Sequence, residues 1–346
     1  MRPEERSELI LRNTEEIVTE EELLTLVDQK SNPSIYIGYA PTGQMHIGHY
    51  TTIRKLVDFL HADLDVTVLI ADLHAHLDDE KSPYDLLEAR SEYYQKAITA
   101  MIRAAGADPS AISFVRGSEF ELEEPYTLDL FRLAAETTIG RTQRAGSEVV
   151  RQRDNPRLGS LLYTLMQTLD VAALQADIAY GGIDQRGIYM LSREVLPSLD
   201  YQKPICLFAP LLSGLDGEKM SASEASTSVS LTDEEAELER KIMDAYCPAG
   251  ERENNGILEY LEYLMFPVLS ETNEEFLISR PEQYGGDIAY RTYDSLEADF
   301  LAGELHPQDL KSATSTALND LLAPVREELL SDPRLLATAY PESFEE

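Results

Sequence analysis

The order of apolar runs between residues 34 and 210 constrains the fold more than any other feature of this chain. Short apolar runs rich in β-branched residues alternate there with longer segments of helical periodicity. The strand-like runs are 34–39, 65–71, 112–115, 177–180 and 205–209, and the helical segments include 49–61, 85–105, 158–174 and 185–196. This alternation predicts an α/β domain with a mostly parallel sheet that helices cover on both faces.

Two stretches depart from the alternation. Residues 117–159 have helical periodicity without a strand-like run, which indicates a helical insertion between the two halves of the sheet. Beyond residue 210 the chain becomes rich in Gly and Ser, and from residue 233 onward it is helical, with further helices expected at 257–266, 295–302 and 307–330. We therefore expect a catalytic domain over 1–223, with a mobile loop at 213–226, and an all-α domain over 227–346.

The net charge has two interpretations. The 346 residues include 29 Lys and Arg against 63 Asp and Glu, which gives a formal charge of −34. A hydrophobic fraction of 43% excludes an acidic disordered chain, because enough apolar surface is present to form a core. The charge argues against a polyanionic partner. Alternatively, it reflects adaptation to molar salt, where the Debye length falls to about 3 Å and a dense carboxylate surface repels itself little.

The two cysteines, Cys206 and Cys247, are too few for a disulfide scaffold and are typical of buried core residues in a reducing compartment. No apolar run approaches the roughly 20 residues that cross a bilayer, and the first residues do not form a signal peptide. We therefore expect a cytoplasmic protein. The chain has no Cys/His spacing typical of a metal site, so any metal is expected to arrive with a nucleotide.

The strongest local motif is GYAPTGQMHIGH, from Gly38 to His49. It follows the first predicted strand and opens a helix, where free N–H groups and the helix dipole favour an anion. Gly48 leaves room for a flat ring against the backbone, while His46 and His49 can donate hydrogen bonds to phosphate oxygens. A tight turn with two surface histidines is the plain structural alternative for this motif alone.

A second motif, KMSAS at residues 219–223, follows the last predicted strand in a Gly- and Ser-rich loop. A lysine in such a loop can approach the phosphates of a nucleotide and stabilise the charge that develops as pyrophosphate leaves. Alone, this stretch would be an ordinary exposed loop. Both motifs in this order, at opposite ends of one α/β domain, resemble the two signatures of class I aminoacyl-tRNA synthetases, which have a Rossmann-like catalytic domain.

One predicted helix carries a polar face. Tyr163, Gln167 and Asp170 stand at positions i, i+4 and i+7 of segment 158–174 and therefore point the same way. A half-buried helix normally presents an apolar stripe to the core, so a mixed polar stripe favours a binding role over a solvated face. Tyr36 lies on the strand before the histidine motif, and Gln185 follows the Gly181-Gly182 turn.

These five positions resemble the tyrosine pocket of archaeal-type tyrosyl-tRNA synthetases, and similar segments extend over nearly the whole chain. The resemblance implies that Tyr36 and Asp170 hold a phenol hydroxyl, that Tyr163, Gln167 and Gln185 hold an ammonium group, and that His74 lines the pocket. It implies catalytic roles for His46, His49, Lys219, Ser221 and Ser223. The implied ATP-binding residues are Gly38, His46, Gly48, His49, Lys219 and Ala222.

The implied reaction consumes ATP with Mg²⁺ to make tyrosyl-adenylate, and then transfers the tyrosyl group to tRNA(Tyr). Catalysis would consist mainly of positioning and charge stabilisation. The resemblance places Arg144 and Arg186 at the acceptor stem. It places Tyr284, His306 and Asp309 at the anticodon, where an aromatic ring can stack on a base and a carboxylate can accept from a guanine edge. It also implies a homodimer.

Three positions depart from the family pattern: Ala40 where Glu is usual, Ala222 where Lys or Ser is usual, and Gly187 where a basic residue is usual. Three alternatives therefore stay open. They are a tryptophanyl-tRNA synthetase, against which the polar Tyr36 and Asp170 argue; a paralogue that activates tyrosine for an acceptor other than tRNA; and a catalytically silent RNA-binding or regulatory protein. If the acidic surface is an adaptation to salt, we expect loss of folding at low ionic strength and a shallow salt dependence of tRNA binding, because counterion release is weak in molar salt.

Overall fold

The computed structural model of the chain describes all residues except 79–80, 150–156, 219–227 and 344–346. Its centre is a six-stranded sheet in the order β1-β6-β5-β2-β3-β4. Five strands are parallel, and β1 pairs with β6 in the antiparallel direction. The strands are β1 (Glu16–Val18), β2 (Ser34–Tyr39), β3 (Asp65–Ile70), β4 (Ile112–Arg116), β5 (Ile178–Gly182) and β6 (Ile205–Ala209). The predicted α/β class with a parallel sheet is confirmed.

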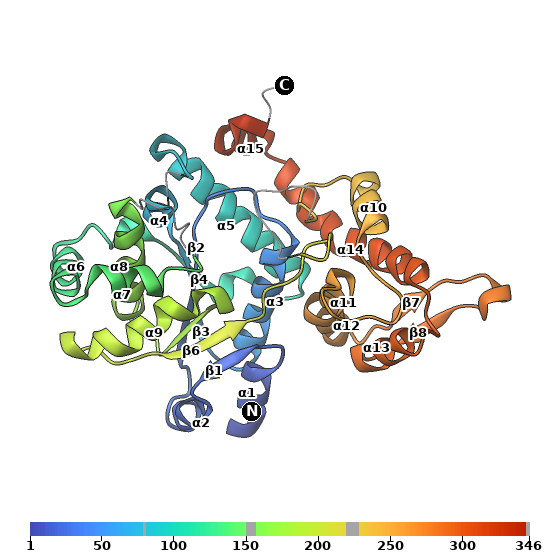
Figure 1. Cartoon of the computed structure of the whole chain (residues 1–346), viewed down its shortest axis with the longest axis horizontal. Coiled ribbons are helices and arrows are strands. Elements are labelled where there is room, and N and C mark those ends of the chain that lie inside the picture. The colour runs from blue at the N-terminus through green and yellow to red at the C-terminus, as the bar shows by residue number, and fades with distance from the viewer. Residues whose placement is uncertain (79–80, 150–156, 219–227, 344–346) are drawn as a thin grey trace.

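Helices surround this sheet and form most of the remaining described chain (Figure 1). Those before residue 218 are α1 (Pro3–Leu11), α2 (Glu20–Gln29), α3 (Ile47–His61), α4 (Asp72–Leu77), α5 (Leu87–Ala104), α6 (Glu124–Glu136), α7 (Ile139–Ala145), α8 (Leu158–Ala173) and α9 (Arg186–Val195). Those after residue 227 are α10 (Glu235–Asp244), α11 (Gly256–Tyr260), α12 (Phe266–Thr272), α13 (Tyr293–Leu301), α14 (Pro307–Leu330) and α15 (Pro333–Ala339).

The sheet separates two apolar layers because alternate side chains of a strand point to opposite faces. Ile35 and Ile37 of β2 join the core that α3 and α5 cover. Tyr36, between them, joins a second core that includes Met166 of α8 and Tyr189 of α9. The alternation thus carries the hydroxyl of Tyr36 to the same side of the sheet as the polar face of α8.

The strand order reverses between β2 and β5. From β2 the chain proceeds outward through β3 to β4, whereas from β5 it proceeds in the other direction to β6. Open α/β sheets bind ligands at such a reversal, beyond the carboxyl ends of the strands. Here those ends are Tyr39 of β2 and Gly182 of β5.

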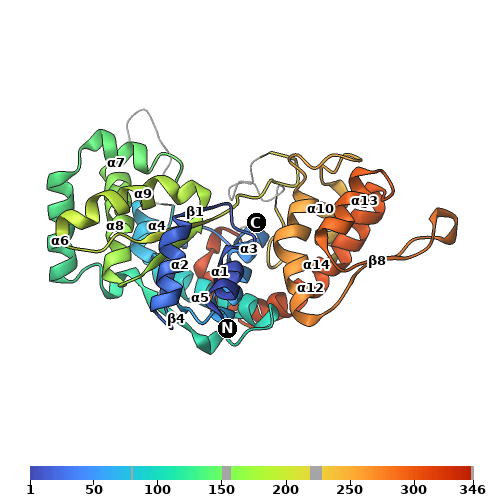
Figure 2. The ribbon, with the colours of Figure 1, turned by 90° about the horizontal axis from the view of Figure 1, so that it is seen from below.

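The C-terminal region, from residue 228 onward, lies beside the sheet domain as a second body (Figure 2). It is mostly helical, but the expectation of an all-α region is not met, because it also contains a two-stranded antiparallel sheet. Its strands are β7 (Phe276–Ile278) and β8 (Ile288–Tyr290). The predicted boundary between 223 and 227 lies outside the described residues.

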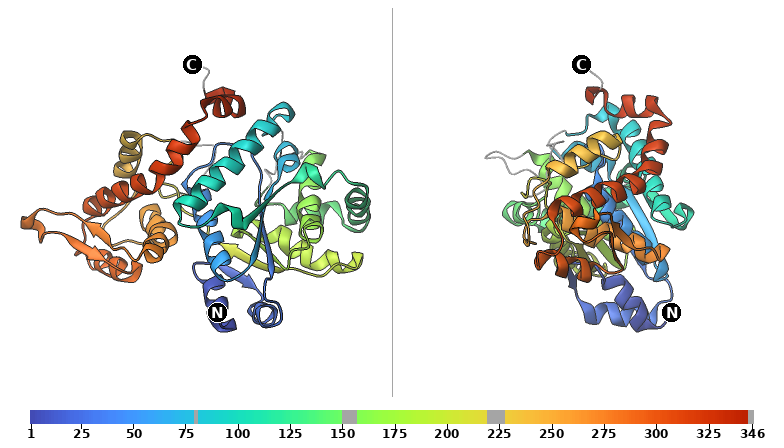
Figure 3. Two further views of the ribbon diagram at one scale, coloured as in Figure 1. Left: turned by 180° about the vertical axis from the view of Figure 1, so that it is seen from behind. Right: turned by 90° about the vertical axis from the view of Figure 1, so that its right-hand side faces the viewer.

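The last helices return to the sheet domain. Both α14 and α15 pack against α5, as the view from behind shows (Figure 3). Arg90 of α5 is 2% exposed and donates to the carbonyl of Ala339 over 2.8 Å, with its guanidinium 4.7 Å from the ring centre of Tyr340. The end of the chain is therefore part of the packing around the sheet.

In the described part of the chain, both cysteines are buried and free, and no helix has the length and apolarity that a bilayer span requires.

Candidate functional site

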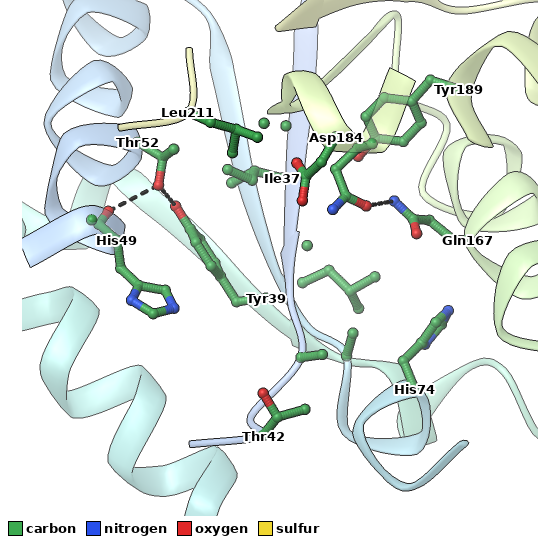
Figure 4. A pocket seen from close by; sticks show the side chains of 18 of the residues that line it. Ile37, Tyr39, Thr42, His49, Thr52, His74, Gln167, Asp184, Tyr189 and Leu211 are labelled. Carbon is green, nitrogen blue, oxygen red and sulfur yellow. Dashed lines mark hydrogen bonds between the residues drawn. The ribbon is translucent and has the colours of Figure 1, made fainter. Parts of the chain in front are cut away.

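A cavity of about 360 Å³ opens at the reversal of strand order (Figure 4). The ends of β2 and β5 form its floor, and residues of α3, α4, α8 and α9 form its walls. Ten of the predicted site residues line it: Tyr36, Gly38, His46, Gly48, His49, His74, Tyr163, Gln167, Asp170 and Gln185. The fold thus joins residues from two separate stretches of the sequence, 36–74 and 163–185.

At one end of the cavity, two histidines form the first turn of α3. His46 is the N-cap residue, and its Nδ1 accepts a hydrogen bond from the backbone N–H of Gly48 over 3.2 Å. The Nδ1 of His49 accepts in turn from the backbone N–H of His46, also over 3.2 Å. Because both Nδ1 atoms accept, these bonds assign the ring proton of each neutral histidine to Nε2. Each ring can therefore donate from Nε2 to a ligand.

Burial keeps both rings neutral. Desolvation and the neighbouring His49 hold the pKa of His46 well below its usual value. Desolvation likewise lowers the pKa of His49 to about 4. The two ring centres are only 4.2 Å apart, so a charge on one would disfavour a charge on the other. At neutral pH this end of the cavity offers hydrogen-bond donors without a net charge on the imidazoles.

The described residues on either side of the second motif border the same end of the cavity. Leu211 and Leu212 line it, and after the gap Val229 accepts a hydrogen bond from the N–H of Ile47 over 2.9 Å. Ser230 forms an isolated antiparallel bridge with His46. Lys219, Ser221, Ala222 and Ser223 themselves lie outside the described residues.

At the other end of the cavity, two buried oxygen atoms have no hydrogen-bond partner in the described chain. These atoms are the hydroxyl of Tyr36 and Oδ2 of Asp170, both on side chains that are 1% exposed. The other carboxylate oxygen, Oδ1, accepts from the hydroxyl of Tyr126 over 2.7 Å. Oδ2 has only a longer ion-pair contact, 3.4 Å from Nε2 of His74. Buried polar atoms are nearly always hydrogen-bonded, so a hydroxyl and a carboxylate oxygen without hydrogen bonds indicate a ligand that both donates and accepts.

The wall between the two ends is rich in acceptors. Gln167 donates to Oε1 of Gln185 over 2.9 Å, which leaves the Oε1 of Gln167 buried and unpaired within the described structure. Tyr163 lies edge-on to the ring of His74, with 4.8 Å between the ring centres. Two further carboxylates, Asp78 and Asp184, also line this region. Such a set of oxygens suits a cationic group.

The two predicted acceptor-stem arginines are exposed and lie on adjoining helices. Arg144 is on α7, and Arg186 begins α9 and forms an ion pair with Glu16, whose Oε2 lies 2.6 Å from its Nε. The helices touch at Gly187, where an added Cβ would stand 2.3 Å from the carbonyl oxygen of Ala145. The close packing of α7 and α9 therefore leaves no room for a basic side chain at position 187.

The three predicted anticodon residues all lie in the C-terminal region. Tyr284, at 65% exposure, ends a short 3₁₀ turn between β7 and β8. His306 caps α14 by accepting from the N–H of Gln308, and Asp309 is in the first turn of that helix. Arg280 donates both to the carbonyl of Gly286 and to that of Glu304, so it links the loop of Tyr284 to the segment before His306.

Sequence reasoning misses several residues of the site. Asp78 and Tyr189 line the cavity, whereas Tyr126 and Glu121 lie behind it against Asp170 and His74. Glu121 and Tyr126 carry no local signal, because their contacts with His74 and Asp170 form only in the tertiary structure. Ala40 also lines the cavity, so this cavity lacks the carboxylate of the Glu that is usual at that position in the family.

Comparison with known proteins gives consistent matches. The family model of class I tRNA synthetases (W and Y) matches residues 28–323. The tyrosine–tRNA ligase of Natronomonas pharaonis is 66% identical over 341 residues, which are 99% of each chain. That of Haloarcula marismortui is 63% identical over 98% of each chain, and both organisms are halophilic archaea. The crystal structure of the Archaeoglobus fulgidus tyrosyl-tRNA synthetase with L-tyrosine superposes with a TM-score of 0.89 at 43% identity, over 95% of this chain and 100% of that one.

Proposed function

The chain belongs to the class I tRNA synthetases of the tryptophan and tyrosine type, and from this we infer that it is a tyrosine–tRNA ligase. It uses ATP to activate L-tyrosine as tyrosyl-adenylate and transfers the tyrosyl group to the 3′ end of tyrosine tRNA. The observation that carries this function is one cavity with two groups of polar atoms. The hydroxyl of Tyr36 and Oδ2 of Asp170, both buried and without a hydrogen-bond partner in the described chain, lie at one end, and the His46 and His49 donors lie at the other.

We propose that the hydroxyl of the substrate donates to Oδ2 of Asp170 and accepts from the hydroxyl of Tyr36. Both atoms are buried and lack a hydrogen-bond partner in the described structure, so one phenol would give a hydrogen bond to each. Phenylalanine would leave both unpaired, and an unpaired buried group costs about 1–3 kcal/mol, more when it is charged. Tryptophan would place an indole against the same two polar atoms. This chemistry supports tyrosine over either alternative.

The ammonium group of the substrate would lie against Tyr163, Gln167 and Gln185. The unpaired Oε1 of Gln167 supports this placement, as do the carboxylates of Asp78 and Asp184. The substrate carboxylate then points toward the histidine end of the cavity, where the α-phosphate of ATP must stand for attack. Holding two reactants in this way supplies much of the rate acceleration, because the entropy of bringing them together is lost on binding.

At the phosphate end, His46 and His49 would donate from Nε2 to the phosphate oxygens, and the backbone beside Gly38 and Gly48 would leave room for the adenosine. Lys219 would add a charge as pyrophosphate leaves, with Ser221, Ala222 and Ser223 of the same motif beside it. Leu212, which lines the cavity, and Val229, which accepts from the N–H of Ile47 at the start of α3, support this assignment. Mg²⁺ would arrive on the phosphates of ATP, because the carboxylates that line the described cavity are Asp78, Asp170 and Asp184, at the amino-acid side.

The tRNA would contact two separate faces. Arg144 and Arg186 would meet the acceptor stem; the exposed pair of Arg186 with Glu16 is weak enough for a phosphate to replace. Tyr284, His306 and Asp309 would meet the anticodon, supported by the bridge that Arg280 makes between their loops. We place the division between the two functional domains in the predicted interval of 223–227.

A homodimer is supported by large exposed apolar side chains on one side of the molecule. They are Leu122, Leu128, Phe131, Ile139 and Leu158, each between 49% and 77% exposed, on or next to α6, α7 and α8. Exposed apolar groups gathered in this way are typical of interfaces, and a second copy of this chain offers the same surface in return. We place the enzyme in the cytoplasm, where tRNA charging takes place.

The test is pyrophosphate exchange in molar KCl with tyrosine, phenylalanine and tryptophan in turn. Exchange with tyrosine alone is expected. Exchange that is faster with tryptophan would identify a tryptophanyl enzyme, and the absence of exchange with all three would favour a catalytically silent protein. The three positions that depart from the family pattern keep the tyrosine-activating paralogue as the second candidate; it would exchange with tyrosine without charging tRNA.

A further inference from the structure

A buried carboxylate stands behind the cavity without lining it. Glu121 is 3% exposed, and neither of its carboxylate oxygens has a hydrogen-bond partner in the described chain. Its Oε1 lies 3.4 Å from Nδ1 of His74. On the opposite side of the imidazole, Nε2 lies 3.4 Å from Oδ2 of Asp170. The three side chains therefore form a row from the protein interior to the end of the cavity that we assign to the substrate hydroxyl.

The turn that carries Glu121 is held by backbone hydrogen bonds and by close packing. The N–H of Glu121 donates to the carbonyl of Gly117 over 2.8 Å, and a Cβ on Gly117 would stand 2.5 Å from the Glu121 carboxylate. The backbone N–H of Ser118 donates to Asp72 over 2.9 Å, which fixes this turn on the first turn of α4. His74 is two residues further along α4, so the turn holds the carboxylate of Glu121 beside Nδ1 of His74.

Asp170 is held by the same neighbourhood from the other side. The hydroxyl of Tyr126, on α6, occupies Oδ1 of Asp170, which leaves only Oδ2 for both His74 and a substrate hydroxyl. Burial and the charge of Glu121 raise the pKa of Asp170, while His74 and Tyr126 oppose that rise. The charge on His74 favours the carboxylate form of Asp170, which only accepts hydrogen bonds, over the protonated form, which can also donate one.

The charge on His74 depends on its partners. Burial alone would lower the pKa of His74, but Glu121, Asp170 and, more weakly, Asp72 outweigh it and raise the pKa to about 9. Tyr163 faces the ring edge-on and contributes no formal charge. Of the two closest carboxylates, Asp170 belongs to the cavity and Glu121 does not.

We propose that Glu121 is a positioning residue for tyrosine recognition: it holds a protonated His74, which in turn orients Oδ2 of Asp170 toward the substrate hydroxyl. This inference rests on the proposed function, because it assigns Asp170 to the phenol. It adds a determinant that does not touch the substrate. Substrate selectivity then depends on a proton held between Glu121 and Asp170.

A divalent cation is the competing occupant, because one ligand atom from each of His74, Glu121 and Asp170 lies within 4.8 Å of the other two. The proton agrees better with the proposed site. A cation would coordinate Oδ2 of Asp170 and thereby remove the acceptor that the substrate hydroxyl needs. It would also require the imidazole to be neutral.

The experiment combines histidine-selective NMR with exchange kinetics. The chain has only six histidines, so the imidazole signals can be followed individually and that of His74 assigned from a His74→Asn variant. In the wild-type protein His74 is expected to stay protonated up to about pH 9. In Glu121→Gln its titration midpoint should fall by about one pH unit or more, because one of its two flanking charges is gone.

In pyrophosphate exchange, Glu121→Gln should raise KM for tyrosine about tenfold while KM for ATP stays within about twofold. Glu119→Gln is the matched control: it removes the same charge two residues away, from an exposed side chain that accepts from the backbone N–H of Arg116. It should change neither the His74 titration nor KM for tyrosine. Glu121→Asp keeps the charge and should keep His74 protonated.

Three results would overturn the proposal. They are a wild-type His74 that titrates near its ordinary pKa, a Glu121→Gln protein with unchanged titration and unchanged KM for tyrosine, or a stoichiometric metal in the purified protein that is lost from Glu121→Gln. If Glu121→Gln does not fold, the titration of His74 in the wild-type protein still tests the proposal, because an ordinary pKa there would overturn it. Failure of the proposed function is distinguishable, because it would abolish tyrosine-dependent exchange in the wild type and leave the NMR titration unaffected.

Discussion

The hydroxyl of Tyr340 donates a hydrogen bond over 2.7 Å to the carbonyl of Gly43, although 297 residues separate them. Gly43 belongs to the turn that leads into His46, and Tyr94 of α5 donates to the same carbonyl over 2.8 Å. Arg90 connects the partners, because it donates both to Thr42 of the turn and to Ala339 of α15. The end of the chain thus supports the turn that positions the histidines.

We therefore predict that Tyr340→Phe lowers the free energy of unfolding by about 1 kcal/mol, the net value of one hydrogen bond. Because the turn leads into His46, KM for ATP should rise by up to about fivefold, while KM for tyrosine should stay unchanged. Denaturant unfolding and exchange kinetics measure both effects. Tyr84→Phe, at a side chain that is 64% exposed, is the control. Equal changes in both Michaelis constants would contradict a local effect on the turn.

Asp170→Ala should abolish the preference for tyrosine over phenylalanine in pyrophosphate exchange. The substitution removes the buried carboxylate that we assign to the substrate hydroxyl, so tyrosine loses an interaction that phenylalanine never makes. A loss of about 2–4 kcal/mol corresponds to a fall in selectivity of about 30-fold to 1,000-fold. The ratio of kcat/KM for the two amino acids measures it. An unchanged ratio would remove Asp170 from the hydroxyl site.

Asp309→Ala should weaken tyrosylation of tRNA by about tenfold, as expected for one lost contact to a base, and leave tyrosine-dependent exchange intact. Tyrosylation of tRNA needs the anticodon contact, whereas tyrosine-dependent pyrophosphate exchange takes place wholly in the cavity. Asp320→Ala, at an exposed position on the same helix, should change neither reaction. Equal losses in both assays for Asp309→Ala would indicate a folding defect instead.

His49 should stay neutral down to about pH 5, because burial lowers its pKa to about 4. The unfolded chain binds this proton near pH 6.5, so the contribution of His49 to stability is complete above that pH and is lost as the pH falls toward 4. His46 shifts in the same direction. Histidine-selective NMR from pH 8 to pH 4 checks both rings. A midpoint near 6.5 for either ring would contradict the neutral-donor account.

The surface charge predicts a dependence on salt. With a formal charge of −34, the folded chain repels itself, and lowering KCl from molar to about 0.1 M lengthens the Debye length from about 3 to 10 Å. We expect cooperative loss of the circular dichroism signal over that range, together with a shallow salt dependence of tRNA binding above it. A protein fully folded in dilute buffer would show that the acidic surface is not an adaptation to salt.

The sequence predicts the parallel sheet well because its strands are long and apolar. The ranges 34–39 and 205–209 agree with β2 and β6 at both ends. The strands that it misses are β1, β7 and β8, each of three residues. Such short strands have too little periodicity to detect, and β1 and the β7–β8 pair depend on antiparallel pairing with a partner.

The candidate site divides in the same way. Tyr36, Gln167 and Asp170 can be found from strand alternation and helical spacing, because both are local patterns. Glu121 and Tyr126 cannot, since they approach His74 and Asp170 only after a turn and α6 pack onto α4 and α8. The same holds for Tyr340, whose role depends on the return of the chain to α5. Residues that act through another residue thus require the tertiary structure.

The most direct test of the central claim is aminoacylation of tyrosine tRNA with radiolabelled tyrosine in molar KCl, with phenylalanine and tryptophan as competitors. We predict that the tRNA becomes charged with tyrosine and that neither competitor at equal concentration reduces the yield. Tyrosine-dependent exchange without any charging of the tRNA would contradict the claim and identify an enzyme that activates tyrosine for another acceptor.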